Sequence, residues 1–201
     1  MPIYILAAVL AAMAGFAAMS FLYRGPAGVI STAENAASDA GAATASGLER
    51  LVRVDPPGTL SGVTFSDGEG RARTLSEWRG KVVLVNLWAT WCAPCKREMP
   101  SLDRLQAKLG GAHFAVLPIS LDRTGPEKPR QFLAANGLKN LDLFLDSGNT
   151  LMQAMRAPGL PLSVLLDRQG REIARLAGPA EWDGAEAETM IRALLAQAGD
   201  G

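Results

Sequence analysis

The feature that most constrains this chain is a pair of cysteines two residues apart, Cys92 and Cys95, in the run Trp-Cys-Ala-Pro-Cys. They are the only two cysteines in 201 residues, so a disulfide within one chain must join them. The pair follows directly after the apolar run at residues 82–88. A pair with this spacing is typical of a redox-active dithiol, of half a metal site, or of a short structural disulfide.

The apolar pattern predicts an α/β fold with a mixed central β-sheet flanked by helices. Residues 81–88 and 113–121 are nearly unbroken apolar runs, which is typical of strands covered on both faces. Between them, at 93–109, apolar residues recur every three or four positions and predict a helix. Further strands are expected at 63–65, 72–75, 141–145, 162–166 and 173–177, and further helices at 127–136, 150–156 and 185–196. The first two of these strands flank a glycine-containing turn, so we expect an N-terminal β-hairpin.

The first part of the chain predicts a membrane anchor. Residues 3–23 carry no charge, and roughly 20 apolar residues in a helix cross the roughly 30 Å hydrocarbon layer. We therefore expect residues 1–24 to form a single transmembrane helix. A cleaved secretory signal is the alternative, although no basic residue precedes the apolar run. Residues 25–47 are rich in Ala, Gly and Ser and predict a flexible linker, which leaves 48–201 as the folded domain.

Composition narrows the class of partner. The chain has 20 basic and 20 acidic residues, so no basic excess is available to displace counterions from phosphates. We expect no nucleic-acid partner. No glycine fingerprint for a flavin or nicotinamide follows any predicted strand, so no cofactor is expected.

A helix that starts just after Cys92 gives the two cysteines different roles. The unpaired N–H groups of the first turn carry partial positive charge and stabilise a thiolate at Cys92, which makes this sulfur the attacking nucleophile. Cys95, one turn further on, is close enough to resolve a mixed disulfide. Pro94 lacks an N–H and has a fixed φ that suits the first helical turn. Ala93 and Pro94 offer the thiolate no side-chain hydrogen-bond donor. We therefore expect the pair to act as a reductant, with a reduction potential nearer roughly −270 mV than roughly −120 mV.

Two other interpretations of the cysteine pair remain open. A structural disulfide across so short a loop constrains the unfolded chain little. A zinc site needs two more ligands, whereas the chain has no other cysteine and a single histidine, His113. A copper site that combines the two cysteines with His113 or a methionine is conceivable. We predict no resident metal.

Residues 85–96, which read Val-Asn-Leu-Trp-Ala-Thr-Trp-Cys-Ala-Pro-Cys-Lys, resemble the active-site strand and helix of the thioredoxin superfamily. Gly159, Leu160 and Pro161 are similar to its cis-proline loop. The run at 92–100, the apolar N-terminus, the linker and the tail at 178–182 resemble the TlpA/ResA-like family more narrowly. This resemblance covers about residues 60–196 and implies a thioredoxin-like fold.

The resemblance also implies roles for individual residues. Cys92 matches the nucleophile and Cys95 the resolving thiol. Pro161, after Leu160, matches the cis-proline that faces the disulfide; an ordinary trans proline at the start of a strand is the alternative. Glu98 matches an acidic residue that tunes cysteine protonation, and its alternative is a solvated helical glutamate.

The chain departs from thioredoxin itself at Asn86, where thioredoxin carries a buried aspartate. An asparagine cannot act as a base, so Glu98 is the carboxylate expected to assist. Trp88 and Trp91 match aromatic residues around the active site, although a role in the core or at its rim explains them equally well.

By the same resemblance, the chain is expected to be a reductase of the bacterial inner membrane with its catalytic domain in the periplasm and its N-terminus in the cytoplasm. The implied substrates are Sco-like copper chaperones and the Cu(A) subunit of cytochrome oxidase, or apocytochrome c. A membrane reductant of the DsbD or CcdA kind supplies electrons, and a monomer is expected. A copper-binding assembly factor without redox turnover and a redox-inert scaffold are the alternatives.

Overall fold

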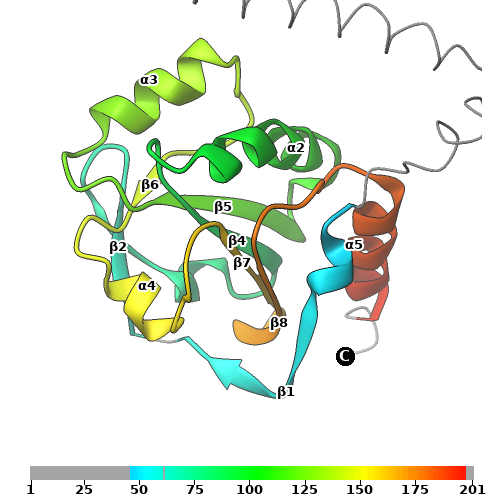
Figure 1. The fold of residues 1–201 in the computed structure, drawn as a ribbon. Coiled ribbons are helices and arrows are strands. Elements are labelled where there is room, and N and C mark those ends of the chain that lie inside the picture. The colour runs from blue at the N-terminus through cyan, green and yellow to red at the C-terminus, as the bar shows by residue number, and fades with distance from the viewer. Residues whose placement is uncertain (1–45, 61, 198–201) are drawn as a thin grey trace, which may run out of the picture. The chain divides into compact units, whose positions relative to one another are not determined.

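The computed structural model describes residues 46–60 and 62–197 (Figure 1). The predicted transmembrane helix at 1–24 and nearly all of the predicted linker at 25–47 lie outside these residues. Within the described ranges, none of the helices is both long and apolar enough to cross a membrane. The elements are η1 (Leu48–Arg50), β1 (Val52–Thr59), β2 (Thr64–Asp67), β3 (Ala72–Thr74), η2 (Leu75–Trp78), β4 (Val82–Trp88), α2 (Ala93–Leu109), β5 (Phe114–Ser120), α3 (Glu127–Ala135), β6 (Phe144–Leu145), α4 (Thr150–Ala154), β7 (Leu162–Leu166), β8 (Arg171–Ala177) and α5 (Ala185–Gln197).

These strands form one mixed sheet in the order β1-β8-β7-β4-β5-β6-β2-β3. The pairs β4–β5 and β5–β6 are parallel, as the two strand–helix–strand units require, and the remaining pairs are antiparallel. Strand β4 lies near the middle of the sheet, and all seven of its residues are buried. The predicted α/β fold and its N-terminal hairpin, β2–β3, are confirmed.

The sheet separates two apolar cores, because successive side chains of a strand point to opposite faces. On β4, Leu84 and Trp88 pack in one core with residues of α2, α3 and α5. Val85 and Leu87 pack in the other core with residues of α4. Figure 1 shows α2 and α3 on the opposite side of the sheet from α4. The cysteines therefore follow the carboxyl end of a strand, β4, that is packed against an apolar core on each face of the sheet.

Strand β1 (Val52–Thr59) is the one strand of the described residues that the sequence pattern did not predict; the short helices η1 and η2 were not predicted either. The strand contains Asp55-Pro56-Pro57-Gly58, and two prolines and a glycine are unfavourable in a strand interior. It forms an edge strand that pairs with β8, with a shift of register between Arg53 and Gly58. Edge position tolerates these residues because only one side of the strand needs backbone partners. Strand β6 is also shorter than the predicted 141–145.

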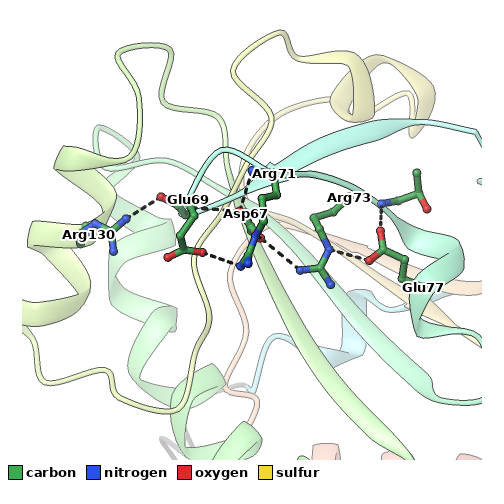
Figure 2. A network of polar contacts seen from close by, with 8 residues as sticks. Asp67, Glu69, Arg71, Arg73, Glu77 and Arg130 are labelled. Atoms are coloured by element: carbon green, nitrogen blue, oxygen red, sulfur yellow. Dashed lines mark hydrogen bonds and ion pairs between the residues drawn. The ribbon is translucent and has the colours of Figure 1, made fainter.

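The turn between β2 and β3 is held by a polar network (Figure 2). The buried carboxylate of Asp67 accepts hydrogen bonds from the backbone N–H groups of Glu69 and Arg71 and from both arginine side chains, Arg71 and Arg73. Arg130 of α3 donates to the carbonyl of Gly68 at 2.7 Å. A hollow of about 490 Å³ lies beside this network. Each of the three arginines is already bonded to the protein, so we interpret the cluster as structural.

Candidate active site

The two cysteines lie at the first turn of α2, directly after the loop that follows β4. They are joined by a disulfide with an S–S distance of 2.00 Å. Cys92 is the N-cap residue of the helix, and its sulfur accepts a hydrogen bond from the backbone N–H of Cys95 at 3.3 Å. Pro94 occupies the first turn, where no N–H is needed. The helix predicted at 93–109 is confirmed with these bounds.

The two sulfurs differ in how an outside molecule can reach them. Cys92 is 6% exposed, whereas Cys95 has no exposed surface. An incoming thiol or disulfide therefore meets the pair at Cys92, and Cys95 can react only with a sulfur already bonded there. The roles of Cys92 as nucleophile and Cys95 as resolving thiol stay predictions that this difference in exposure favours.

The two tryptophans next to the site lie in different environments. Trp88 is fully buried and packs against Phe132 of α3, with ring centroids 5.3 Å apart. Trp91 is 69% exposed although it directly precedes Cys92. Trp88 is therefore part of the core, and Trp91 is an apolar surface beside the reactive sulfur.

The loop before β7 contains the predicted cis peptide bond, between Leu160 and Pro161. Pro161 is buried and Leu160 is half-buried, in contact with both apolar cores. The carbonyl of Pro161 accepts a hydrogen bond from the N–H of Gly178 at 2.9 Å, which fixes the loop to the end of β8. The role of Pro161 opposite the disulfide stays a prediction.

Glu98 lies one helical turn after Cys95 and is buried, at 2% exposure. One carboxylate oxygen accepts a hydrogen bond from the side-chain amide of Asn86 at 2.8 Å, and the other accepts one from the backbone N–H of Ala180 at 3.0 Å. The same Asn86 amide donates to the hydroxyl of Ser163 at 3.0 Å. Glu98 is therefore not a solvated helical glutamate, and Asn86 is one of its direct partners.

Burial shifts the protonation of this carboxyl group. Loss of solvent raises the pKa of Glu98 from its ordinary value of 4.5 to about 7, and the negative charge of Glu181 acts in the same direction. The hydrogen bonds from Asn86 and Ala180, and the side chain of Trp182, oppose the rise. Within the described part of the chain, the indole N–H of Trp182 has no hydrogen-bond partner. Asn86 and Ala180 are therefore the main groups that lower the pKa of Glu98. Desolvation dominates, and Glu98 exchanges a proton near neutral pH.

A hollow of about 290 Å³ includes Glu98 in its lining. Its lining includes Arg50, Arg97, Ala180 and Glu181. Glu98 is therefore buried, yet it borders a hollow at the surface of the domain.

A second buried carboxylate, on Asp122, supports the active-site loop. It accepts hydrogen bonds from the backbone N–H of Thr90 at 2.9 Å, from the Thr90 hydroxyl at 2.6 Å and from the Ser120 hydroxyl at 2.8 Å. Neither Asp122 nor Ser163 was among the site residues predicted from the sequence. The position of Asp122, as a charged residue just after a buried strand, was a usable signal; Ser163 lies within a predicted apolar strand and gave none.

Among the described residues, the two cysteines are not joined by further side chains that could complete a metal site. Within residues 46–60 and 62–197 there is no group of three or more His, Cys, Asp and Glu side chains placed to hold a metal ion. His113 lies just before β5 and is exposed.

Comparison with known proteins relates the whole site to one family. The Redoxin family model matches residues 56–191. The chain is 30% identical over 117 residues to the thiol-disulfide oxidoreductase ResA of Bacillus thuringiensis, which covers 56% of this chain and 64% of that protein. It is 34% identical over 132 residues to the thiol:disulfide interchange protein HelX of Rhodobacter capsulatus, which covers 66% of this chain and 67% of that protein.

A crystal structure of a DsbE-type protein from Chlorobium tepidum has the same fold, with a TM-score of 0.62 and 27% identity. The match covers 71% of this chain and 99% of that chain. The residues that the Redoxin model matches include both the cysteine turn and the loop of the cis peptide. The chain therefore belongs to the Redoxin family and, within the thioredoxin superfamily, to its TlpA/ResA-like members.

Proposed function

We propose that this chain is a thiol:disulfide oxidoreductase that acts as a reductase of partner disulfides. The observation that carries the proposal is the disulfide at the start of α2, in which Cys92 is reachable and Cys95 is completely buried. The names of the relatives, thiol-disulfide oxidoreductase and thiol:disulfide interchange protein, support the same chemistry.

The reaction proceeds in two exchanges that conserve electrons and sulfur bonds. In the reduced protein, the Cys92 thiolate attacks one sulfur of the partner disulfide, so that a Cys92–partner disulfide forms and the other partner sulfur leaves as a thiolate. The Cys95 thiol then loses its proton and attacks the Cys92 sulfur. The partner leaves with two thiols after protonation, and the disulfide seen in the structure is formed.

Glu98 is the acceptor that we propose for the Cys95 proton. It lies three residues after Cys95, on the same side of the helix, and both residues are buried. Its pKa of about 7 lets the carboxyl group take up and release a proton near neutral pH. The hollow beside it, lined by Arg50 and Arg97, gives the proton a way to solvent.

The compartment and the partners are further parts of the proposal. We infer an inner-membrane protein with a periplasmic catalytic domain, because the apolar N-terminal run and the family likeness favour it. The plain Ala93 and Pro94 between the cysteines favour a reductant, which a DsbD- or CcdA-like membrane protein then regenerates. The proposed substrates are Sco-like copper chaperones and the Cu(A) subunit, with apocytochrome c as the other candidate.

A trapping experiment tests the proposal. The Cys95→Ser variant keeps the nucleophile and loses the resolving thiol, so partners should accumulate as mixed disulfides on Cys92. Non-reducing gels and mass spectrometry of membranes that contain the full chain identify the adducts. The Cys92→Ser variant is the control and should give none. Equal adducts in both variants, or none in either, would contradict the assigned roles.

Copper titration separates this function from the copper-binding alternative. Reduced wild-type protein is titrated with Cu(I) under anaerobic conditions, and the reduction of insulin disulfides is followed in parallel. Insulin reduction that disappears in Cys92→Ser supports the reductase. Tight stoichiometric copper binding without any disulfide exchange would replace it with a metal-binding role.

A further inference from the structure

A groove of about 460 Å³ borders Trp91, the residue directly before Cys92, and its lining includes residues of α3 and α4. Its apolar lining comes from Trp91, Leu121 and Met152. Trp91 and Val52 are the large apolar side chains that remain exposed within the described ranges, and only Trp91 borders this groove. An exposed indole of this size is costly to leave in water, so a partner that covers it gains hydrophobic stabilisation.

Two cations lie along the same groove. Arg123, in the loop after β5, and Lys128, in the first turn of α3, both line it and are both exposed. Across residues 46–60 and 62–197, neither forms an ion pair with an acidic side chain of the protein. Their charges therefore remain available to a partner.

Among the described residues that line the groove, Asp122 is the one acidic residue, and its carboxylate is already hydrogen-bonded. Its carboxylate accepts three hydrogen bonds, two from Thr90 and one from Ser120, and only 4% of the residue is exposed. The outward-facing charge of the groove is consequently positive. Thr90 directly precedes Trp91, and Asp122 directly precedes Arg123. The hydrogen bonds between Thr90 and Asp122 therefore hold the backbone at Trp91 close to the loop that contains Arg123.

We propose that this groove binds the segment of a substrate protein that flanks its reactive cysteine, and that it selects segments with an apolar side chain next to acidic ones. The apolar side chain covers Trp91 and Met152, and carboxylates pair with Arg123 and Lys128. Such pairing favours encounter with acidic partners and suppresses basic ones. The inference rests on the proposed thiol:disulfide exchange function, because only a partner bonded to Cys92 brings this segment to the groove.

Two matched peptides test the selection. Each peptide contains one leucine and one cysteine, and the cysteine is protected as a mixed disulfide with 2-nitro-5-thiobenzoate. The acidic peptide has aspartates beside the cysteine, the basic peptide has lysines there, and the two are otherwise identical. Attack of reduced Cys92 on the peptide sulfur releases the coloured thiolate, so stopped-flow absorbance gives the rate. At low salt the acidic peptide should react about tenfold faster than the basic one, and the ratio should approach one at about 1 M salt.

Charge reversal assigns the effect to the groove. In Arg123→Glu/Lys128→Glu, the ratio of the two rates should fall by about tenfold or more. The matched control is Lys139→Glu/Arg79→Glu, which reverses two exposed cations outside the groove and should keep the wild-type ratio. A Leu→Ser change in the acidic peptide should slow its reaction, because the contact with Trp91 is lost.

The outcomes separate this inference from the proposed function. Equal rates for the two peptides, or a preference that survives in Arg123→Glu/Lys128→Glu, would overturn the groove as the selecting surface while leaving the exchange function intact. No reaction of the reduced wild-type protein with either peptide or with insulin would overturn the exchange function and the groove together.

Discussion

The surroundings of Glu98 set the protonation of its carboxyl group. Glu98 is held by Asn86 and by the backbone of Ala180, and both partners meet the ionised form well. The pKa of Glu98 nevertheless rises to about 7, because the loss of solvent outweighs two good hydrogen bonds. Glu98 is thus a buried carboxyl group with a raised pKa one helical turn after Cys95, in a chain that has Asn86 where thioredoxin has a buried aspartate.

Glu98 should make the stability of the protein depend on pH. Its folded pKa, about 7, exceeds its ordinary value of 4.5, so its stabilising contribution is complete below about 4.5 and is lost as the pH rises to about 7. The shift of about 2.5 pK units corresponds to about 3 kcal/mol. Urea unfolding of the oxidised protein at several pH values should show this decrease, and Glu98→Gln should remove it.

A control variant distinguishes this effect from the loss of any carboxylate. Glu127 is exposed on α3, so Glu127→Gln should retain the wild-type pH dependence. In Glu98→Gln, the pH profile of disulfide exchange should also lose its inflection near 7. A Glu98→Gln profile that is identical to wild type in both measurements would assign Glu98 no part in proton transfer.

Strand β5 and helix α2 meet at the active-site loop through Asp122. Strand β4 ends at Trp88, and Thr90, two residues later, is bonded twice to the Asp122 carboxylate just beyond β5. The parallel pairing of β4 with β5 brings these two strand ends together. The cysteine turn is therefore fastened to the sheet on the side that faces the groove.

Asp122→Asn should weaken this connection. The amide retains the shape of the carboxylate but removes its charge. Its N–H₂ group replaces either the oxygen that accepts from the Thr90 N–H and the Ser120 hydroxyl, or the oxygen that accepts from the Thr90 hydroxyl. We expect a decrease of about 1–3 kcal/mol in the free energy of unfolding, measured by urea denaturation. Asp142→Asn is the matched control, because Asp142 is exposed and its change should have little effect. Equal stability of the two variants would show that the Thr90 contacts contribute little.

The N-terminal edge of the described region closes the hollow beside Glu98. Arg50 of η1 donates to the carbonyl of Pro179, and the N–H of Glu181 donates to the carbonyl of Ser46 at 2.8 Å. Gly47 lies between them with φ of 81°. A Cβ atom there would lie 2.5 Å from the carbonyl oxygen of Pro179, so this approach requires glycine.

Gly47→Ala should therefore separate this edge from the rest of the domain. We expect a loss of more than about 1 kcal/mol in the free energy of unfolding, from the positive φ alone. Gly80→Ala is the matched control, because Gly80 has φ of 91° but nothing within 4 Å of an added Cβ atom. The excess loss at Gly47 measures the close contact. Water should also reach Glu98 more easily, so the pH-dependent decrease in stability should become smaller; an unchanged decrease would contradict this coupling.

Local signals in the sequence predicted most of the elements. The apolar runs of β4 and β5 and the helical spacing of α2 depend on near neighbours alone, and their predicted bounds agree with the structure. The cis peptide between Leu160 and Pro161 was also expected, from family likeness. Strand β1 escaped prediction because its prolines oppose a strand locally, and only pairing with the distant β8 offsets them.

By itself, the sequence determined the cysteine pair, its place at the start of a helix and the order of the strands and α-helices from β2 to α5, since each is set by residues close together in the chain. The tertiary structure decided that Trp91 is exposed while Trp88 is buried, and that Glu98 lies against Asn86 and Ala180. These properties depend on solvent exclusion by segments that are distant in sequence. A pKa or an exposed surface is therefore fixed only when those segments pack together.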